Sequence, residues 1–184
     1  MAESRHDFGP VNRIEAEAFG EPGQRTFRVF TANEIEAAAL WLEKEQLRAL
    51  GQAVEEQLSR LKALRMSNDV AAPDTALAFA GEPSLDFRVG QMALGFDERQ
   101  GLFLLLVYAV EDDDESRPTF SCQATPAQLR ALSERIEEVV SSGRPQCPLC
   151  GEPMERTGHH CIRTNGHREQ PVPPLAADED ESTE

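Results

Sequence analysis

Two stretches of the chain place apolar residues at the spacing of an amphipathic helix. In residues 44–64 the apolar positions follow one another at steps of three and four, at Leu47, Leu50, Val54, Leu58 and Leu61. Residues 125–140 show the same steps, at Leu129, Leu132, Ile136 and Val140. The second stretch also begins with a start signal, because Thr125 can cap the helix, Pro126 suits its first turn and Gln128 can complete a capping box. Both stretches are predicted to be helices that pack one face on a core.

Three strand-like segments precede each predicted helix. The first three cover residues 10–19, 25–31 and 34–42, and the second three cover 85–96, 102–111 and 119–124. Turns within each set are too short for a crossover, so each set is predicted to form an antiparallel meander. The run LFLLLVYAV has no polar alternation, which is typical of a central strand buried on both faces. Trp41, near the end of the third segment, is predicted to lie in the core.

The two helices share five consecutive letters, because QLRAL occurs at residues 46–50 and again at 128–132. Together with the strands, this match predicts an α+β fold of two repeated strand-strand-strand-helix units that share an antiparallel sheet core. The predicted boundaries are, in order, a first repeat at 1–65, a linker at 66–84, a second repeat at 85–142, a zinc-ribbon-like segment at 143–168 and an acidic disordered tail at 169–184.

Composition and charge restrict the function classes. The nine residues of the longest apolar run are too few to cross a bilayer, and the N-terminus lacks the apolar stretch of a secretory signal, so a cytoplasmic protein without membrane association is expected. The net charge of −15 makes nucleic acid an unlikely partner for the acidic body, since phosphate binding requires Lys and Arg. Six acids and no base lie in the last sixteen residues, a composition typical of a solvated tail.

The main candidate for chemistry is the segment CPLCGEPMERTGHHCIRTNGH at residues 147–167. Zinc in proteins takes four tetrahedral ligands, and Cys147 and Cys150, with two residues between them, can present two thiolates to one ion. Cys161 supplies a third thiolate. His159 or His167 is expected to be the fourth ligand, and the spacing leaves both histidines open. We therefore expect one structural zinc ion, whose binding offsets the small apolar core of so short a segment.

Three other interpretations of these cysteines remain. A redox pair normally opens a helix after a strand, whereas this pair is flanked by prolines and glycines. The thiols can also be unliganded. If both histidines stayed off the metal, water would take the fourth position and a hydrolytic site would result.

Residues elsewhere have structural interpretations. Cys122 is expected to be a buried structural cysteine. The acidic run at 111–115 lacks the spacing of a calcium loop and is typical of a solvated hairpin tip. Between residues 143 and 168 four arginines face two glutamates, so this segment can contact nucleic acid or an acidic surface.

Four groups of residues resemble one known family. FGEPGQRTF, LEKEQ, FRVGQMALGFDE and the CPLCG, GHHC and RTNGH elements occur in this order, and together they resemble an uncharacterised, chiefly actinobacterial family known as domain of unknown function 3090. The resemblance extends from about Asp7 to His167. It implies a non-secreted chain with a metal-binding end and implies no catalytic residues. Ile162 stands where family members often have proline.

A non-enzymatic binding or adaptor protein with an unknown protein partner is the expected function. One alternative is an enzyme, or the regulatory subunit of one, with a cleft between the repeats. A second alternative is nucleic-acid contact through the basic segment at residues 143–168.

Overall fold

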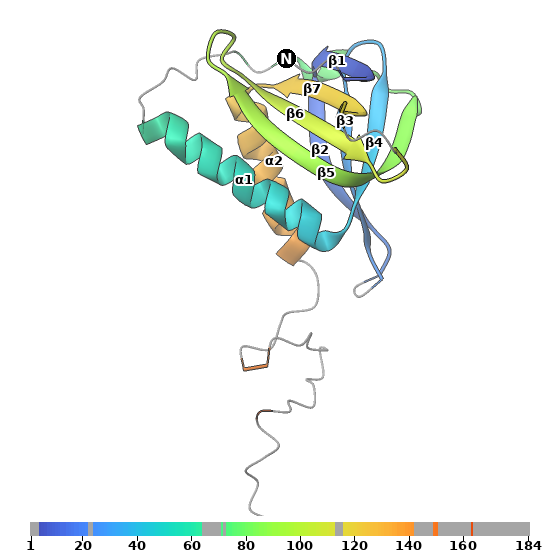
Figure 1. The fold of residues 1–184 in the computed structure, drawn as a ribbon, viewed down its shortest axis with the longest axis vertical. Coiled ribbons are helices and arrows are strands. Elements are labelled where there is room, and N and C mark those ends of the chain that lie inside the picture. The colour runs from blue at the N-terminus through green and yellow to red at the C-terminus, as the bar shows by residue number, and fades with distance from the viewer. Residues whose placement is uncertain are drawn as a thin grey trace, which may run out of the picture. The chain divides into compact units, whose positions relative to one another are not determined.

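The computed structural model describes residues 4–21, 24–63, 71, 73–112, 116–141, 149–150 and 163. The chain divides by its internal contacts into two units, residues 1–143 and 144–184. The helices and strands of the described residues lie in the first unit, which is called the body below. It has a mixed α+β architecture with a seven-stranded sheet and two helices (Figure 1).

The described residues of the body form ten elements. In chain order they are β1 (His6–Pro10), β2 (Arg13–Phe19), β3 (Thr26–Ala32), β4 (Ala37–Leu42), α1 (Lys44–Ala63), the 3-10 helix η1 (Thr75–Leu77), β5 (Leu85–Asp97), β6 (Leu102–Ala109), β7 (Phe120–Ala124) and α2 (Pro126–Ser141). Of the described helices, none is long and apolar enough to cross a membrane.

The strand order across the sheet is β1-β7-β6-β5-β4-β3-β2. Strands β2, β3 and β4 form one antiparallel meander, and β5, β6 and β7 form another, as predicted. The expectation of a purely antiparallel sheet is wrong, because β4 pairs parallel with β5 and β1 pairs parallel with β7. A parallel pair needs a long crossover, and α1 supplies it between β4 and β5.

Two consecutive residues form hydrogen bonds to strands near the two opposite edges of the sheet. The backbone N–H of Val11 donates to the carbonyl oxygen of Gln123 on β7, at 2.9 Å, and the N–H of Asn12 donates to the carbonyl oxygen of Ala32 on β3, at 2.8 Å. Strands β1 and β2 lie at opposite ends of the strand order, yet they are joined by these two residues. The sheet must therefore curl until its two edges approach.

Both helices pack on the inner face of this curled sheet and on each other (Figure 1). The core that they close contains Leu47, Leu50 and Val54 of α1, Leu129, Leu132 and Ile136 of α2, and inward side chains of the strands, among them Phe27, Leu40, Phe103, Leu105, Phe120 and Cys122. The helices approach closely at Gly51, where an added Cβ would lie 3.0 Å from Cγ2 of Ile136. A side chain at position 51 would thus require the Ile136 side chain to move by a few tenths of an ångström.

The start of α2 has the predicted capping box. The N–H of Thr125 donates to the side-chain oxygen of Gln128, at 2.8 Å, and the N–H of Gln128 donates to the Thr125 hydroxyl oxygen, at 3.2 Å. At the start of α1 the N–H of Glu43 donates in the same way to Gln46, at 2.9 Å. Because orphan N–H groups at a helix end are costly, these contacts help to fix where both helices begin.

Three local predictions are wrong. The segment predicted as one strand at residues 10–19 is interrupted at residues 11–12, so Pro10 ends β1 and Arg13 begins β2. Strand β6 is buried on one face, since Phe103, Leu105, Val107 and Ala109 are buried while the alternate residues Leu102, Leu104, Leu106 and Tyr108 are half-buried. Trp41 is half-buried, and its Nε1–H donates to Asp86 at 2.8 Å. An indole N–H needs such a partner, which the outer face provides.

Candidate functional site

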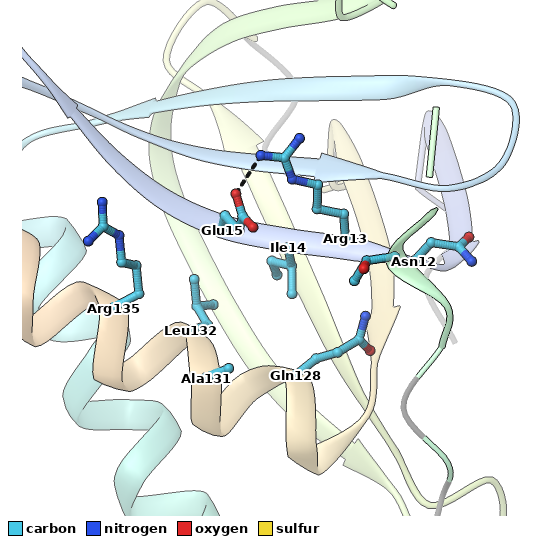
Figure 2. A pocket seen from close by; sticks show the side chains of 9 residues that line it. Asn12, Arg13, Ile14, Glu15, Gln128, Ala131, Leu132 and Arg135 are labelled. Atoms are coloured by element: carbon cyan, nitrogen blue, oxygen red, sulfur yellow. Dashed lines mark hydrogen bonds and ion pairs between the residues drawn. The ribbon is translucent and has the colours of Figure 1, made fainter. Parts of the chain in front are cut away.

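A pocket of about 470 Å³ lies between edge strand β2 and the first turns of α2 (Figure 2). Its lining residues come from three elements and the bend before β2, and they are Asn12, Arg13, Ile14, Glu15, Thr75, Gln128, Ala131, Leu132 and Arg135. Positions 128, 131, 132 and 135 are spaced by three or four residues, so they share one face of the helix. This face of α2 is therefore the pocket wall opposite β2.

Side chains of α2 hydrogen-bond to the backbone along the edge of the sheet. Gln128 Nε2 donates to the carbonyl oxygen of Val11 at 2.8 Å, and Arg135 Nε donates to that of Ala16 at 3.3 Å. An edge strand exposes backbone groups that would otherwise pair with another strand. The helix takes part of that role, and it holds the pocket wall in a fixed position.

The charged groups at the pocket have partners. Arg13 pairs with Glu15 at 2.5 Å, and the Arg13 guanidinium lies 5.1 Å from the centre of the Phe30 ring. The hydrogen bond to Glu15 raises the pKa of Arg13 above its ordinary value, so its charge is permanent. Arg135 pairs with Glu138 at 2.8 Å. The charged side chains of the lining are thus paired within the body, although the chain as a whole is strongly acidic.

Asn12 of the lining and Asp74, which precedes the lining residue Thr75, are held by backbone contacts. Asn12 Nδ2 donates to the carbonyl oxygen of Asp74 at 3.2 Å, and the Asp74 carboxylate accepts from the N–H of Ala76, which anchors η1. Figure 2 shows Ile14 and Leu132 between β2 and α2, whereas Arg13 and Glu15 lie on the opposite side of the strand. The space beside α2 is therefore apolar for the most part, and the amide of Gln128 and the guanidinium of Arg135 can hydrogen-bond to a ligand there.

A second hollow, of about 630 Å³, lies where the start of β5 meets the end of β6. It is lined by Asp86, Arg88, Glu111 and Asp112, among other residues. Glu111 accepts from Arg88 at 3.2 Å, and Asp112 accepts from Arg5 at 2.8 Å. These are exposed ion pairs of the kind that contribute little to stability.

Of the five predicted zinc ligands, Cys150 lies within the described residues, where it is half-buried in a turn. Cys147, His159, Cys161 and His167 lie outside them, so the ligand set stays a prediction. Among the described residues, no group of three or more His, Cys, Asp or Glu side chains is placed to hold a metal ion.

Cys122 is fully buried on β7, as predicted. Burial, with a smaller contribution from the negative charge of Asp7, raises the pKa of its thiol to about 12. A thiol that stays protonated is a poor nucleophile. Cys122 is therefore a packing residue.

The pocket beside α2 was not predicted from the sequence. Gln128 was recognised for its cap, but its side-chain NH₂ group reaches a residue 117 positions away, and Arg135 reaches one 119 positions away. The repeated QLRAL was a usable signal for these contacts, because its glutamine occupies the same place at the start of both helices.

One comparison with known proteins gives a match. A family model described as "Protein of unknown function (DUF3090)" matches residues 6–161. Neither the comparison with curated proteins nor that with solved structures gives any match.

Proposed function

The chain belongs to the DUF3090 family, whose description assigns no activity, and from its own residues we propose that it is a non-enzymatic binding or adaptor protein. The observation that carries this proposal is the pocket between β2 and α2. Two polar side chains of its α2 wall are already fixed by contacts within the body, as in Gln128–Val11 and Arg135–Ala16. Fixed groups lose little entropy when a ligand arrives, which favours binding. The ligand that fits combines an apolar part with a polar group that hydrogen-bonds to Gln128 or Arg135.

A variant that fills the pocket tests the binding proposal. Ala131 is an exposed lining residue, so Ala131→Trp adds a large ring to the pocket without entering the core. In a thermal-shift screen of amino acids and dipeptides at about 5 mM, at least one compound should raise the unfolding midpoint of wild type by about 2 °C or more.

The shift should vanish in Ala131→Trp and persist in Ala127→Trp, a matched change at an exposed position of α2 outside the lining. A shift that survives equally in both variants would place the ligand elsewhere. No shift with any compound of the panel would remove the support for this pocket.

A structural zinc ion is the second part of the proposal. Cys147, Cys150 and Cys161 would each supply a thiolate, and His159 or His167 would complete the tetrahedron. The support is the ligand spacing, in a segment that lies within the unit 144–184. A segment of this length can bury little apolar surface by itself, and zinc binding would supply folding free energy that offsets this deficit.

Metal analysis tests the zinc proposal. Purified protein should hold about one equivalent of zinc, and Cys147→Ser should hold under about one tenth, because a thiolate ligand is lost. Comparison of His159→Ala with His167→Ala identifies the fourth ligand, and His160→Ala serves as the matched control. Less than about half an equivalent in wild type would rule the site out.

An internal duplication of the body is the third part. Three observations support it, and the first is the repeated QLRAL at residues 46–50 and 128–132. The second is the register of β4 and β7. The pair Phe27–Leu42 of the β3–β4 ladder corresponds to Phe103–Ala124 of the β6–β7 ladder, so β7 follows β4 by 82 residues, which is also the distance between the two QLRAL segments.

The third observation concerns how each meander begins. Pro10, in the first half, pairs in parallel with Gln123 on the last strand of the second half. Arg88, in the second half, pairs in parallel with Trp41 on the last strand of the first half. The first strand of each half thus pairs with the last strand of the other half. Such an exchange is expected if two copies of one unit fused.

A further inference from the structure

A smaller pocket, of about 240 Å³, lies where the end of β4, the start of α1 and the bend in β5 meet. Its apolar lining consists of Trp41, Leu42, Val89 and Val110, and its polar lining consists of Thr26, Glu43, Gln46 and Arg88. Gln46 Nε2 donates to the carbonyl oxygens of Val89 and Gly90, at 2.9 and 3.2 Å. These bonds fix the backbone of the bend that lines the pocket.

Trp41 gives this pocket an aromatic wall that is held in place. Its Nε1–H is hydrogen-bonded to Asp86, its ring centre lies 5.6 Å from that of Phe19, and the Arg28 guanidinium lies 5.4 Å from the ring. Phe19 is 42% exposed. Fixed, partly exposed aromatic rings beside an arginine are typical of the centres of protein interfaces.

The rim of the pocket is balanced in charge. Glu43 is exposed at the start of α1, and Arg88 is 71% exposed and pairs with Glu111 at 3.2 Å. Glu43 would repel an anionic ligand, and Arg88 would repel a cationic one. A neutral ligand is repelled by neither side chain. It gains contact with Trp41 and with Val110, which is 53% exposed.

Size restricts the ligand further. An apolar cavity of about 150 Å³ holds one benzene molecule. The space beside Trp41 therefore accommodates a single substituted ring and leaves little room for a second one. We propose that this pocket binds one neutral aromatic ring, as the anchor side chain of a phenylalanine or tyrosine in a partner protein. This site is separate from the pocket beside α2, and it does not depend on the proposed zinc site.

Tryptophan fluorescence reports ligand binding at this pocket, because Trp41 lines it and is the sole tryptophan of the chain. The probes are benzyl alcohol, benzylamine and phenylacetate, which carry the same ring with a neutral, positive or negative group. With excitation at about 295 nm, benzyl alcohol should change the emission with a dissociation constant in the millimolar range, as expected for so small a ligand. The two charged probes should bind at least about threefold more weakly.

A charge placed at the pocket should abolish this response. Val110→Glu puts a carboxylate against the ring from an exposed position, and it should weaken benzyl alcohol binding by about tenfold or more. Ile35→Glu is the matched control, since Ile35 is 79% exposed, lies in the β3–β4 turn and is outside the lining. Wild-type affinity is expected for this control.

Three outcomes would overturn the proposal. The first is an unchanged Trp41 emission of folded wild type with benzyl alcohol up to its solubility limit. The second is tighter binding of a charged probe than of the neutral one. The third is an equal response of the Val110→Glu and Ile35→Glu variants, which would show a general solvent effect.

Discussion

Cys122 shows how burial changes the pKa, and with it the reactivity, of a single side chain. The burial that raises its pKa to about 12 leaves about one part in ten thousand as thiolate at pH 8. We predict that iodoacetamide at pH 8 does not modify Cys122 in the folded protein, and that it does so in urea. Peptide mass spectrometry measures both, and rapid modification of the native protein would contradict the burial.

The same residue should make stability depend on alkaline pH. Because the folded-state pKa is raised, the contribution of Cys122 is fully present below the unfolded-state value of about 9 and is lost as pH rises toward about 12. Between pH 7.5 and 10.5, wild type should lose roughly 2 kcal/mol more unfolding free energy than Cys122→Ala does. Urea unfolding at the two pH values measures this difference, and equal losses would exclude the thiol as the cause.

Each helix is tied to the sheet by a glutamine in its first turn. Gln46 and Gln128 accept the N–H of the capping residue, and each also donates to a carbonyl at a strand bend, that of Val89 or Val11. Removal of either side chain leaves both an orphan N–H and an orphan carbonyl. Gln46→Ala and Gln128→Ala should each lower the unfolding free energy by about 1–3 kcal/mol, measured in urea.

Gln52→Ala is the matched control for this prediction, because Gln52 is exposed on α1, and its effect should stay within about 0.5 kcal/mol. Similar losses for Gln46 and Gln128 would agree with a duplicated body. A loss at one position alone would mean that the two bends differ in their dependence on the helix.

The elements that the sequence predicted well are those with a strong period. Both helices follow their apolar spacing, and the meanders follow the short turns between strands. Strand β1 was missed because HDFGP has one large apolar residue, and Gly9 adopts a positive φ of 56° next to a proline. In AAALWL the alternation of large and small or polar residues is weak, because alanine suits either face of the sheet. Trp41 was therefore predicted to face the core, whereas it lies on the outer face.

At the scale of the whole molecule, both pockets depend on contacts that no local pattern contains. The pocket beside α2 includes Asn12, in the bend that joins β1 to β2, and the pocket beside Trp41 includes Gly90, at the bend in β5. Each also includes the glutamine of a helix start, Gln128 or Gln46. The proposed duplication would explain two pockets at related places, and their different linings would then suit different ligands.

The body should fold without the segment at residues 144–184. The buried core runs from Phe8 to Val139, and both helices and all strands of the described residues lie within it or at its limits. A protein ending at residue 143 should unfold cooperatively within about 2 °C of the full-length chain, since it keeps every core residue that the described part of the chain contains.

Chelation of metal from the full-length protein with EDTA should likewise leave the unfolding midpoint of the body unchanged, while metal analysis shows whether an ion is released. Calorimetry of both samples measures the midpoints. A truncated protein that unfolds without cooperativity would mean that the two units share one folding transition, and the metal would then stabilise the whole chain.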